Sequence, residues 1–372
     1  MKVALYAPLK SPLHPVPSGD RQIGRNLLAA LRQAGHAVEL ASELRAYCPD
    51  PTPEAVAALD RAAEAEALRL ASAWAAGGVP DVWFSYHPYY KSPDLIGPRL
   101  ADRFGLPVVT LEASFAPKRA EGPHAALHRE TLALLRRARL NIAFTERDRA
   151  GLALVIQADR LGLLAPFIDV APYRGLAGAA EHGGPVRLVT VAMMREGDKL
   201  RSYAMLAEAL ARLPETGWRL DVVGDGPAGA RVRARFERFP ESRVRFLGEA
   251  DPARVPGLLA GADLLVWPGC GEAFGIAYLE AQAAGLPVVA QATGGIPAVV
   301  RDGGTGVLTP EGDVAAYAAA VGRLIADAGL RRSLGQAARR HVLAVHSIEA
   351  ASARLGALLR PFKPEADRRG QG

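Results

Sequence analysis

The chain has 372 residues, of which 49% are hydrophobic and 23% charged, and only two of them are cysteines. A length above about 250 to 300 residues predicts two hydrophobic cores, and this composition excludes a disordered or fibrous protein. Two cysteines exclude a disulfide framework and a four-cysteine metal site. The net charge of +6 fits an anionic substrate or a membrane surface, but the basic residues do not form the dense, aromatic-rich cluster that nucleic-acid binding requires.

No apolar run reaches the roughly 18 residues that are needed to span a bilayer. The first residues, from Met1 to Pro8, read as a β-strand and not as a secretory signal. We therefore expect a cytoplasmic protein in a reducing compartment. Its slight basic excess would also suit a peripheral position at the inner face of the membrane.

Short β-rich runs alternate with helical patterns along the chain, which is typical of an α/β protein with parallel sheets. In the first half, the predicted strands are 3–7, 38–41, 82–86, 108–111 and 140–144. The helix expected after the first strand has Ile23, Leu27 and Leu31 at four-residue steps, and Gly35 lies just past its end. A proline-rich loop precedes this helix and ends at residues 18–21.

Residues 173–185 are rich in Gly and Ala and lose hydrophobic periodicity, which predicts a linker. The second half repeats the pattern, with strands expected at 186–192, 219–223, 244–247, 264–267 and 287–290, and helix from about Gly312 to Arg360. The predicted domains are 1–172 and 186–345. A C-terminal helix and tail over 346–372 could pack back on the first domain.

The stretch from 262 to 300 carries the most informative pattern, which reads strand, loop, helix, strand and loop. Its loop glycines allow close backbone approach, and the start of the helix offers unpaired N–H groups that stabilise a phosphate. Glu272 lies just before the helix, and Glu280 lies about two turns further in. Carboxylates accept hydrogen bonds from sugar or ribose hydroxyls. The alternative interpretation is a helix-capping acid and a solvated surface residue.

This segment resembles the hallmark of retaining glycosyltransferases of the GT-B fold in sequence family four, the glycosyl transferases group 1. The family pattern is Pro-Ser-x-x-Glu, Phe-Gly, Glu-Ala-x-Ala-x-Gly-x-Pro-Val and Gly-Gly. The matching residues are Pro268, Glu272, Phe274, Gly275, Glu280, Ala281, Ala283, Gly285, Pro287, Val288, Gly294 and Gly295. The resemblance implies two facing, Rossmann-like, doubly wound parallel-sheet domains with an interdomain cleft. It makes 1–172 the acceptor-side domain and 186–345 the domain that binds the nucleotide sugar.

By this resemblance, Glu272 contacts the donor sugar and Glu280 the ribose of the nucleotide. The backbone N–H groups near Phe274 and Gly275 would bind the distal phosphate, and Gly224 resembles a donor-side turn of the family.

In the family, a basic pair after the first strand of the C-terminal domain neutralises the leaving diphosphate, which points to Arg195 and Lys199 in this chain. The usual Gly-Arg-Leu is absent here, and Lys199 can also be interpreted as the start of a solvated helix.

On the N-terminal side, the resemblance makes Gly19 a neighbour of the donor phosphates, and Asp20 and Arg21 contacts of the acceptor or of a phosphate. Asp20 is equally typical of a first helical turn. Many relatives have a histidine where this chain has Glu112, so Glu112 either orients the sugar or leaves that role unfilled. His87 also follows a predicted strand, and a packing role is the alternative.

The resemblance therefore predicts a retaining glycosyltransferase of the hexosyltransferase type. It would move a sugar from a nucleoside-diphosphate sugar to a hydroxyl of a glycan or lipid-linked acceptor, in cell-surface glycan synthesis. The leaving phosphate can take the acceptor's proton, so no general base is required. The resemblance also implies that no metal and no cofactor take part.

Two other interpretations stay open. Gly224, Gly226 and Gly229 have the spacing of a dinucleotide fingerprint, with Glu249 about twenty residues further on. They would suit an NAD-dependent oxidoreductase, although Pro227 interrupts the motif. A catalytically inactive GT-B binding subunit is the other alternative.

Overall fold

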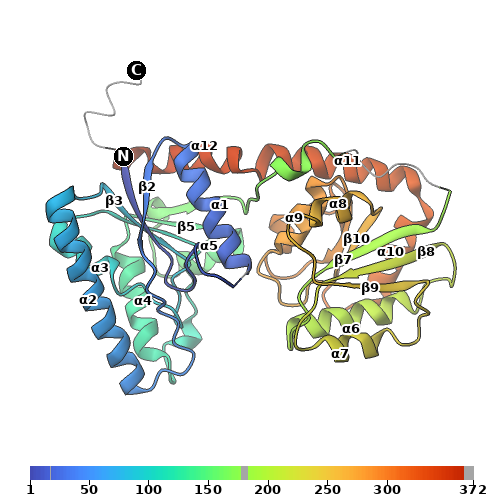
Figure 1. Ribbon diagram of the computed structural model, residues 1–372, viewed down its shortest axis with the longest axis horizontal. Helices are drawn as coiled ribbons and strands as arrows, with labels where there is room; N and C mark the ends of the chain where they lie inside the picture. The colour runs from blue at the N-terminus through green and yellow to red at the C-terminus, as the bar shows by residue number, and fades with distance from the viewer. Residues whose placement is uncertain (17, 177–182, 364–372) are drawn as a thin grey trace. The chain divides into compact units, whose positions relative to one another are not determined.

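The computed structural model describes residues 1–16, 18–176 and 183–363. These residues form two compact units (Figure 1). Unit 1 consists of Met1–Ala165 and the segment from Ile348 onward, and unit 2 is Pro166–Ser347. Each unit contains one six-stranded parallel sheet, so the predicted α/β class with two parallel sheets is confirmed.

The sheet of unit 1 has the order β2-β1-β3-β4-β5-β6, and every neighbouring pair is parallel. The order of the chain reverses between β1 and β3, and in such sheets ligands bind outside the carboxyl ends of the strands at this point. His87 and Glu112 directly follow β3 and β4 at that edge. The strands are β1 (Lys2–Tyr6), β2 (Ala37–Ser42), β3 (Val82–Tyr86), β4 (Val108–Leu111), β5 (Leu140–Ala143) and β6 (Leu161–Leu163).

Helix α1 shows why the elements of unit 1 form where they do. The side chain of Ser18 caps the helix by accepting a hydrogen bond from the Arg21 N–H, and Gly35, with a φ of 81°, follows its end. Its apolar stripe is buried, and α12 packs against it. The helices are α1 (Gly19–Gln33), α2 (Pro53–Gly77), α3 (Gly97–Phe104), α4 (Ala125–Arg137), α5 (Glu146–Ala153) and α12 (Ile348–Leu359).

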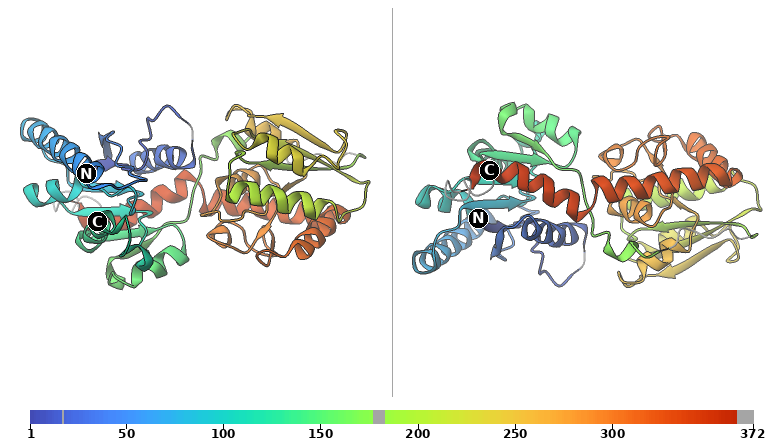
Figure 2. Two further views of the ribbon diagram at one scale, coloured as in Figure 1. Left: turned by 90° about the horizontal axis from the view of Figure 1, so that it is seen from below. Right: turned by 90° about the horizontal axis from the view of Figure 1, so that it is seen from above.

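The sheet of unit 2 has the order β12-β11-β10-β7-β8-β9, and it reverses between β7 and β10. In Figure 1 its strands lie between α6 and α7 on one face and α8, α9 and α11 on the other, and Figure 2 shows the helices flanking the strands from two further sides. The elements are β7 (Val186–Val191), α6 (Asp198–Leu210), β8 (Trp218–Val223), α7 (Gly229–Arg235), β9 (Val244–Gly248), α8 (Val255–Ala260), β10 (Leu264–Val266), α9 (Ile276–Ala283), β11 (Val288–Gln291), β12 (Gly306–Thr309), α10 (Val314–Ala326) and α11 (Ala328–Val345).

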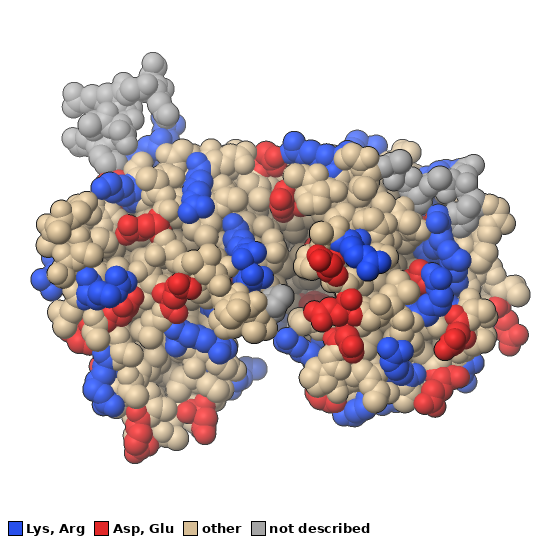
Figure 3. Space-filling model, viewed as in Figure 1, with Lys and Arg blue, Asp and Glu red and all other residues tan. Residues whose placement is uncertain are grey.

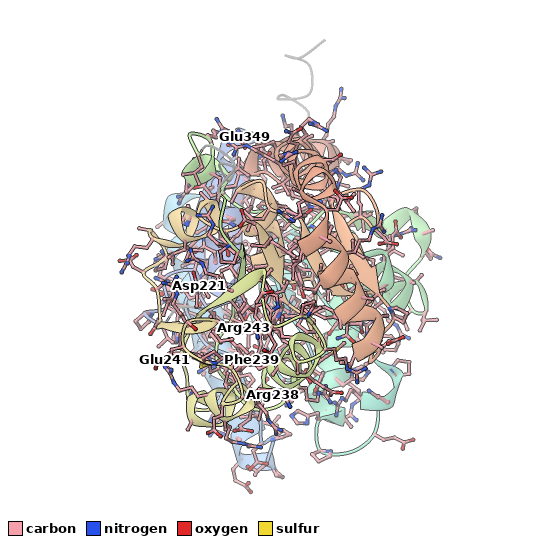
Figure 4. All side chains as sticks on the ribbon, turned by 90° about the vertical axis from the view of Figure 1, so that its right-hand side faces the viewer. Asp221, Arg238, Phe239, Glu241, Arg243 and Glu349 are labelled. Atoms are coloured by element: carbon pink, nitrogen blue, oxygen red, sulfur yellow. The ribbon has the colours of Figure 1, made fainter. Side chains whose placement is uncertain are left out.

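Two arginines make contacts at the edge strand β9, Arg243 directly before the strand and Arg245 within it. The guanidinium group of Arg243 lies 3.9 Å from the ring centre of Trp218 and 5.7 Å from that of Phe239, and Figure 4 shows Arg243 and Phe239 near each other. Arg245 forms an ion pair of 2.8 Å with Asp221 of β8. Charged side chains of this kind protect a sheet edge from pairing with another chain.

The chain passes between the units earlier than the composition predicts. The units divide at Ala165/Pro166, whereas the loss of periodicity predicts a linker at 173–185, of which residues 177–182 lie outside the described part. The side chain of Arg339 in α11 donates hydrogen bonds of 2.9 Å to the carbonyls of Tyr173, Arg174 and Leu176. These bonds hold the beginning of the predicted linker to unit 2.

Figure 3 shows how charged side chains are distributed over one face of the molecule. On the face shown in Figure 3, basic and acidic side chains are interspersed. Among the described helices, none has both the length and the hydropathy needed to cross a bilayer.

Candidate functional site

The loop between β10 and α9 lies at the carboxyl end of the sheet of unit 2, next to the reversal of strand order. Gly269 and Gly275 have φ values of 76° and 79°, which disfavour any other residue. A β-carbon on either glycine would collide with the side chain of Tyr278, whose hydroxyl donates to the Trp267 carbonyl at 3.0 Å. The loop is therefore held tightly against the first turn of α9.

Glu272 in this loop belongs to a compact group of three side chains. Its Oε1 forms an ion pair with the Nζ of Lys199 and accepts a hydrogen bond of 3.1 Å from Nε1 of Trp267. The same Nζ lies 5.5 Å from the ring centre of Trp267. The side chains of Glu272 and Lys199 are only 16% and 27% exposed, so water screens their attraction less than at the open surface. The carboxylate and the cation are thus fixed side by side.

Helix α6 places Lys199 in this group. Asp198 and Lys199 begin the helix, as the alternative interpretation expected, but Lys199 points to Glu272 and not to solvent. The backbone N–H of Cys270 donates to Oγ of Ser202 at 2.9 Å, which ties the loop to the first turns of α6. Lys199 therefore reaches Glu272 because a hydrogen bond holds α6 against the loop before α9.

Arg195 lies apart from this group. It is exposed in the segment between β7 and α6, and in the part of the chain that the structure describes its side chain makes no ion pair or hydrogen bond. The structure thus brings only Lys199 of the predicted basic pair to Glu272. A contact of Arg195 with a diphosphate stays a prediction.

Glu280 lies on α9, and its surroundings are unusual for a carboxyl group. Burial raises its pKa from 4.5 to about 7. The buried Tyr173 is close enough that, after burial itself, the charge of Glu280 raises the pKa of this tyrosine. A solvated surface glutamate would not show this shift. The N-cap of the same helix, Gly275, provides no side-chain cap for the N–H groups of the first turn.

The raised pKa predicts how nucleotide binding depends on pH. If ribose hydroxyls donate to the Glu280 carboxylate, binding favours its charged form, so affinity rises with pH until the free carboxyl is ionised, above about 7. If binding restores an ordinary pKa, the affinity for a nucleotide sugar should increase about tenfold from pH 6 to pH 8. Isothermal titration at both values measures this, and Glu280→Gln should remove the dependence. A dependence that persists in this variant would contradict the assignment.

The dinucleotide-like motif has a packing explanation. Gly224 and Gly226 have φ values of 134° and 152°, and a β-carbon on them would collide with the carbonyls of Ala192 and Met194. The N–H of Gly224 donates to the Gly248 carbonyl at 2.7 Å. These glycines therefore let the ends of β7 and β8 approach each other. The space that a pyrophosphate would need at their α-carbons is filled by the chain itself.

In unit 1, three predicted residues meet at the carboxyl ends of the strands. Nδ1 of His87, after β3, lies 3.0 Å from Oδ1 of Asp20 in the first turn of α1 and 3.9 Å from Oε2 of Glu112, after β4. His87 and Glu112 have φ values of 56° and 59°, which non-glycine residues rarely adopt. The structure therefore brings together Asp20, His87 and Glu112, and a purely apolar packing role does not describe His87.

The pKa values of Asp20, His87 and Glu112 depend on one another. Burial opposes the protonation of His87, but the carboxylates of Glu112 and Asp20 prevail and raise its pKa to about 9. Burial raises the pKa of Glu112 to about 7 against the opposing charge of His87. For Asp20 the bond to His87 outweighs burial, so its pKa is lowered. At neutral pH the cluster thus favours a protonated His87 beside the carboxylate of Asp20.

The remaining predicted residues of unit 1 lie close to this cluster in sequence. Gly19 is exposed and begins α1, and the backbone of Arg21 is capped by Ser18 at 3.3 Å. Nε of Arg21 is buried and has no hydrogen-bond partner among the described residues. The predicted phosphate or acceptor contacts of both residues stay predictions.

Two side chains of these sites are absent from the sequence prediction. Trp267, which donates to Glu272, and Tyr86, which precedes His87, are both fully buried. The only sequence signal for either is its place as the last residue before a strand-end loop. Within the described residues, no group of three or more His, Cys, Asp or Glu side chains is arranged to hold a metal ion.

Sequence comparison connects the chain to known proteins. Residues 185–327 match the family of glycosyl transferases group 1. The chain is 32% identical over 286 residues to a D-inositol 3-phosphate glycosyltransferase of Salinispora arenicola, an alignment that covers 68% of this chain and 64% of that protein. The chain thus matches less than two thirds of the length of that relative.

Comparison with solved structures shows the fold. Sucrose-phosphate synthase of Thermosynechococcus elongatus has a TM-score of 0.74 and 23% identity, with 97% of this chain and 98% of that chain covered. The Anabaena protein HepE, solved in complex with UDP, has a TM-score of 0.72 and 18% identity, with 97% and 100% covered. The two units thus have the architecture of these two proteins.

Proposed function

The chain belongs to the glycosyl transferases group 1 family and has the GT-B fold, and from this premise we propose that it is a retaining glycosyltransferase. It would transfer a sugar from a nucleoside-diphosphate sugar to a hydroxyl of an acceptor. The observation that carries the proposal is the fixed group of Glu272, Lys199 and Trp267 beside the uncapped start of α9. A carboxylate for sugar hydroxyls, and a cation and helix N–H groups for a diphosphate, then come from the loop before α9, the start of α6 and the first turn of α9.

Each donor group would have one role in the transfer. Glu272 holds hydroxyls of the sugar, and Glu280 holds the ribose. Lys199 and the N–H groups near Phe274 and Gly275 stabilise the charge that develops on the leaving diphosphate. The bond from the anomeric carbon to the phosphate oxygen breaks, and the acceptor oxygen bonds to the same face of that carbon. The leaving phosphate takes the acceptor's proton, so no further base is required.

The proposal also suggests which donor and which acceptor should be tested first. A UDP-sugar is the first donor to test, because HepE was solved with UDP and with UDP-glucose. The Asp20, His87 and Glu112 cluster of unit 1 would bind the acceptor. D-inositol 3-phosphate, from the name of the Salinispora relative, is one acceptor to test, and sugars of cell-surface glycans are others.

A panel of UDP-, GDP- and ADP-sugars tests the proposal. Donor hydrolysis and transfer are measured for each, and NMR of the product gives the anomeric configuration. We expect turnover of at least one donor, with its configuration retained. An inverted product would contradict the retaining mechanism, and the absence of any turnover would favour a binding subunit. Binding of NAD would favour the oxidoreductase, which the packing at Gly224 and Gly226 disfavours.

Association with an anionic membrane surface is a further part of the proposal, and a groove of unit 1 supports it. The groove has a volume of about 1020 Å³ and lies at the amino ends of β4, β5 and β6. Arg137, Arg139 and Arg160 line it together with the apolar side chains of Leu358 and Phe362. Guanidinium groups beside an apolar wall suit lipid headgroups and the first part of their chains.

Charge reversal tests this role. The double variant Arg139→Glu and Arg160→Glu should bind vesicles that contain phosphatidylglycerol at least about tenfold more weakly, since each basic residue contributes about 1 kcal/mol at such a surface. Flotation of the vesicles gives the bound fraction. The matched control reverses the exposed Arg235 and Arg238 of unit 2. Equal losses in the two double variants would contradict a specific surface at the groove.

A further inference from the structure

Four rings form an aromatic strip at the carboxyl ends of the strands in unit 1. The centre of the Tyr89 ring lies 5.5 Å from that of His87 and 5.3 Å from that of Tyr90, which in turn lies 5.2 Å from His124 at the N-cap of α4. Tyr89 and Tyr90 are both partly exposed. The aromatic strip thus begins at a residue of the cluster proposed to bind the acceptor and continues over two accessible tyrosines.

The backbone fixes the turn that carries the two tyrosines. Tyr89 and Ser92 exchange hydrogen bonds of 3.2 and 2.8 Å, so Tyr90 and Lys91 form the tip of a tight turn after β3. The N–H of Cys48, in the segment after β2, donates to the Lys91 carbonyl at 2.7 Å. Because the turn is closed and tied to a neighbouring segment, little further ordering is needed when a ligand binds there.

Hydrogen-bond donors lie beside the two tyrosine rings. The guanidinium carbon of Arg119 lies 4.6 Å from the centre of the Tyr90 ring, and Nζ of Lys91 lies 5.9 Å from it. Among the described residues, neither cation forms an ion pair, and the hydroxyls of Tyr89 and Tyr90 form no hydrogen bond. Aromatic surface with donors beside it suits a sugar, because a pyranose presents C–H groups on its faces and hydroxyl oxygens around its ring.

The position of the aromatic strip favours a glycan over a lipid surface. Tyrosine and basic side chains are also typical of membrane interfaces. The groove proposed to contact lipid headgroups, however, lies at the amino ends of β4, β5 and β6, whereas the strip follows the carboxyl end of β3. Because the strip begins at His87, a second sugar unit can contact Tyr89 while the first unit occupies the cluster of Asp20, His87 and Glu112.

We propose that Tyr89 and Tyr90 bind the second and following sugar units of the acceptor, which is therefore an oligosaccharide and not a free monosaccharide or cyclitol. This inference rests on the proposed transferase function, whose acceptor it makes more specific. The C–H groups of these units pack against the two rings, and Arg119 and Lys91 donate to their oxygen atoms. Affinity for the acceptor then increases with the number of sugar units.

Acceptor kinetics as a function of chain length test the role of the two tyrosines. Oligomers of glucose, galactose, mannose and N-acetylglucosamine with one to three units are compared as acceptors of the donor sugar. In a series that is transferred, KM should fall by about tenfold or more from one unit to three, the size expected for one well-packed aromatic contact. Tyr89→Ala and Tyr90→Ala should each remove most of this gain, and Tyr90→Phe, which keeps the ring, should preserve it.

A matched control and a stability measurement accompany these variants. Phe239→Ala removes a partly exposed ring of unit 2 and should leave the dependence on acceptor length intact. Thermal unfolding shows whether each variant folds. The donor KM should change less than the trisaccharide KM in the tyrosine variants, because the contact is made by the acceptor.

Binding to the wild-type protein provides the second arm, which does not depend on turnover. Isothermal titration in the presence of UDP uses the same oligomers, and at least one trimer should bind about tenfold more tightly than its monomer. A KM and an affinity that do not depend on length in any series would overturn the inference. So would tyrosine variants that lose vesicle binding but keep the dependence on length, because the strip would then contact lipid. A wild-type protein that turns over no donor, yet binds trimers more tightly than monomers, would instead contradict the proposed function.

Discussion

Replacing Glu272 by Gln is expected to lower kcat for sugar transfer by about two to three orders of magnitude, the usual effect of removing one preorganised electrostatic contact from a reacting centre. The substitution removes the negative charge that pairs with Lys199, whereas the amide oxygen of Gln can still accept from the Trp267 N–H. The sugar would then lose its carboxylate contact, and Lys199 would be released from its fixed position. Steady-state kinetics with a saturating donor measures the effect.

An exposed glutamate of the same unit provides the control. Glu237→Gln changes charge in the same way, away from the loop before α9, and should leave kcat unchanged. Both proteins should unfold at temperatures within a few degrees of the wild type, since Gln keeps the size of the Glu side chain and only one local ion pair is lost. Near-normal turnover of a folded Glu272→Gln protein would contradict the assignment of this residue.

Replacing Lys199 by Met should have a comparable effect for a different reason. The cation is the one described side chain that links α6 to Glu272, and it is the candidate for stabilising the leaving diphosphate. Loss of one such group is expected to lower kcat by about a hundredfold or more. Arg195→Met is the informative comparison, because Arg195 is exposed and forms no ion pair in the described part of the chain.

The relative size of the two losses identifies the diphosphate cation. We expect Lys199→Met to be the more damaging variant, with kcat reduced more than the donor affinity. If Arg195→Met instead lowers kcat more, Arg195 provides the phosphate contact and Lys199 serves only to position Glu272. Pre-steady-state measurement of a single turnover separates the chemical step from product release.

The strands could be predicted because parallel strands are buried on both faces. The runs of β3 and β4 are buried throughout and mostly apolar, and each begins and ends within a residue or two of its expected position. The short strands β6 and β12 were not predicted. A strand of three or four residues is too short to show a hydrophobic pattern that distinguishes it from a loop. It is recognised as a strand only by its pairing with the neighbouring strand of the sheet.

The residues of the site could be predicted only where a sequence motif indicates their chemical role. The glycines and glutamates of the loop before α9 carry such a pattern, and the structure places Glu272 and Lys199 in contact. Trp267 and Tyr86 were missed, because a buried aromatic residue at a strand end is usually core. The left-handed φ of His87 and Glu112 has no sequence signature, since it arises from the way each residue leaves its strand.

The position at which the chain passes from unit 1 to unit 2 could also not be predicted from the sequence. Loss of periodicity marks where regular structure ends, but the contacts of Arg339 decide which unit holds the irregular segment. Such a contact joins residues more than 160 positions apart and cannot be recognised from local composition.

Isothermal titration of the wild-type protein and of Glu280→Ala with UDP, GDP, ADP and NAD shows which ligand unit 2 binds and whether Glu280 contributes to that binding. We expect that one nucleoside diphosphate binds, that Glu280→Ala weakens this binding by about tenfold or more, and that NAD does not bind. Binding of NAD in preference to every nucleoside diphosphate, or equal affinity in the two proteins, would contradict it.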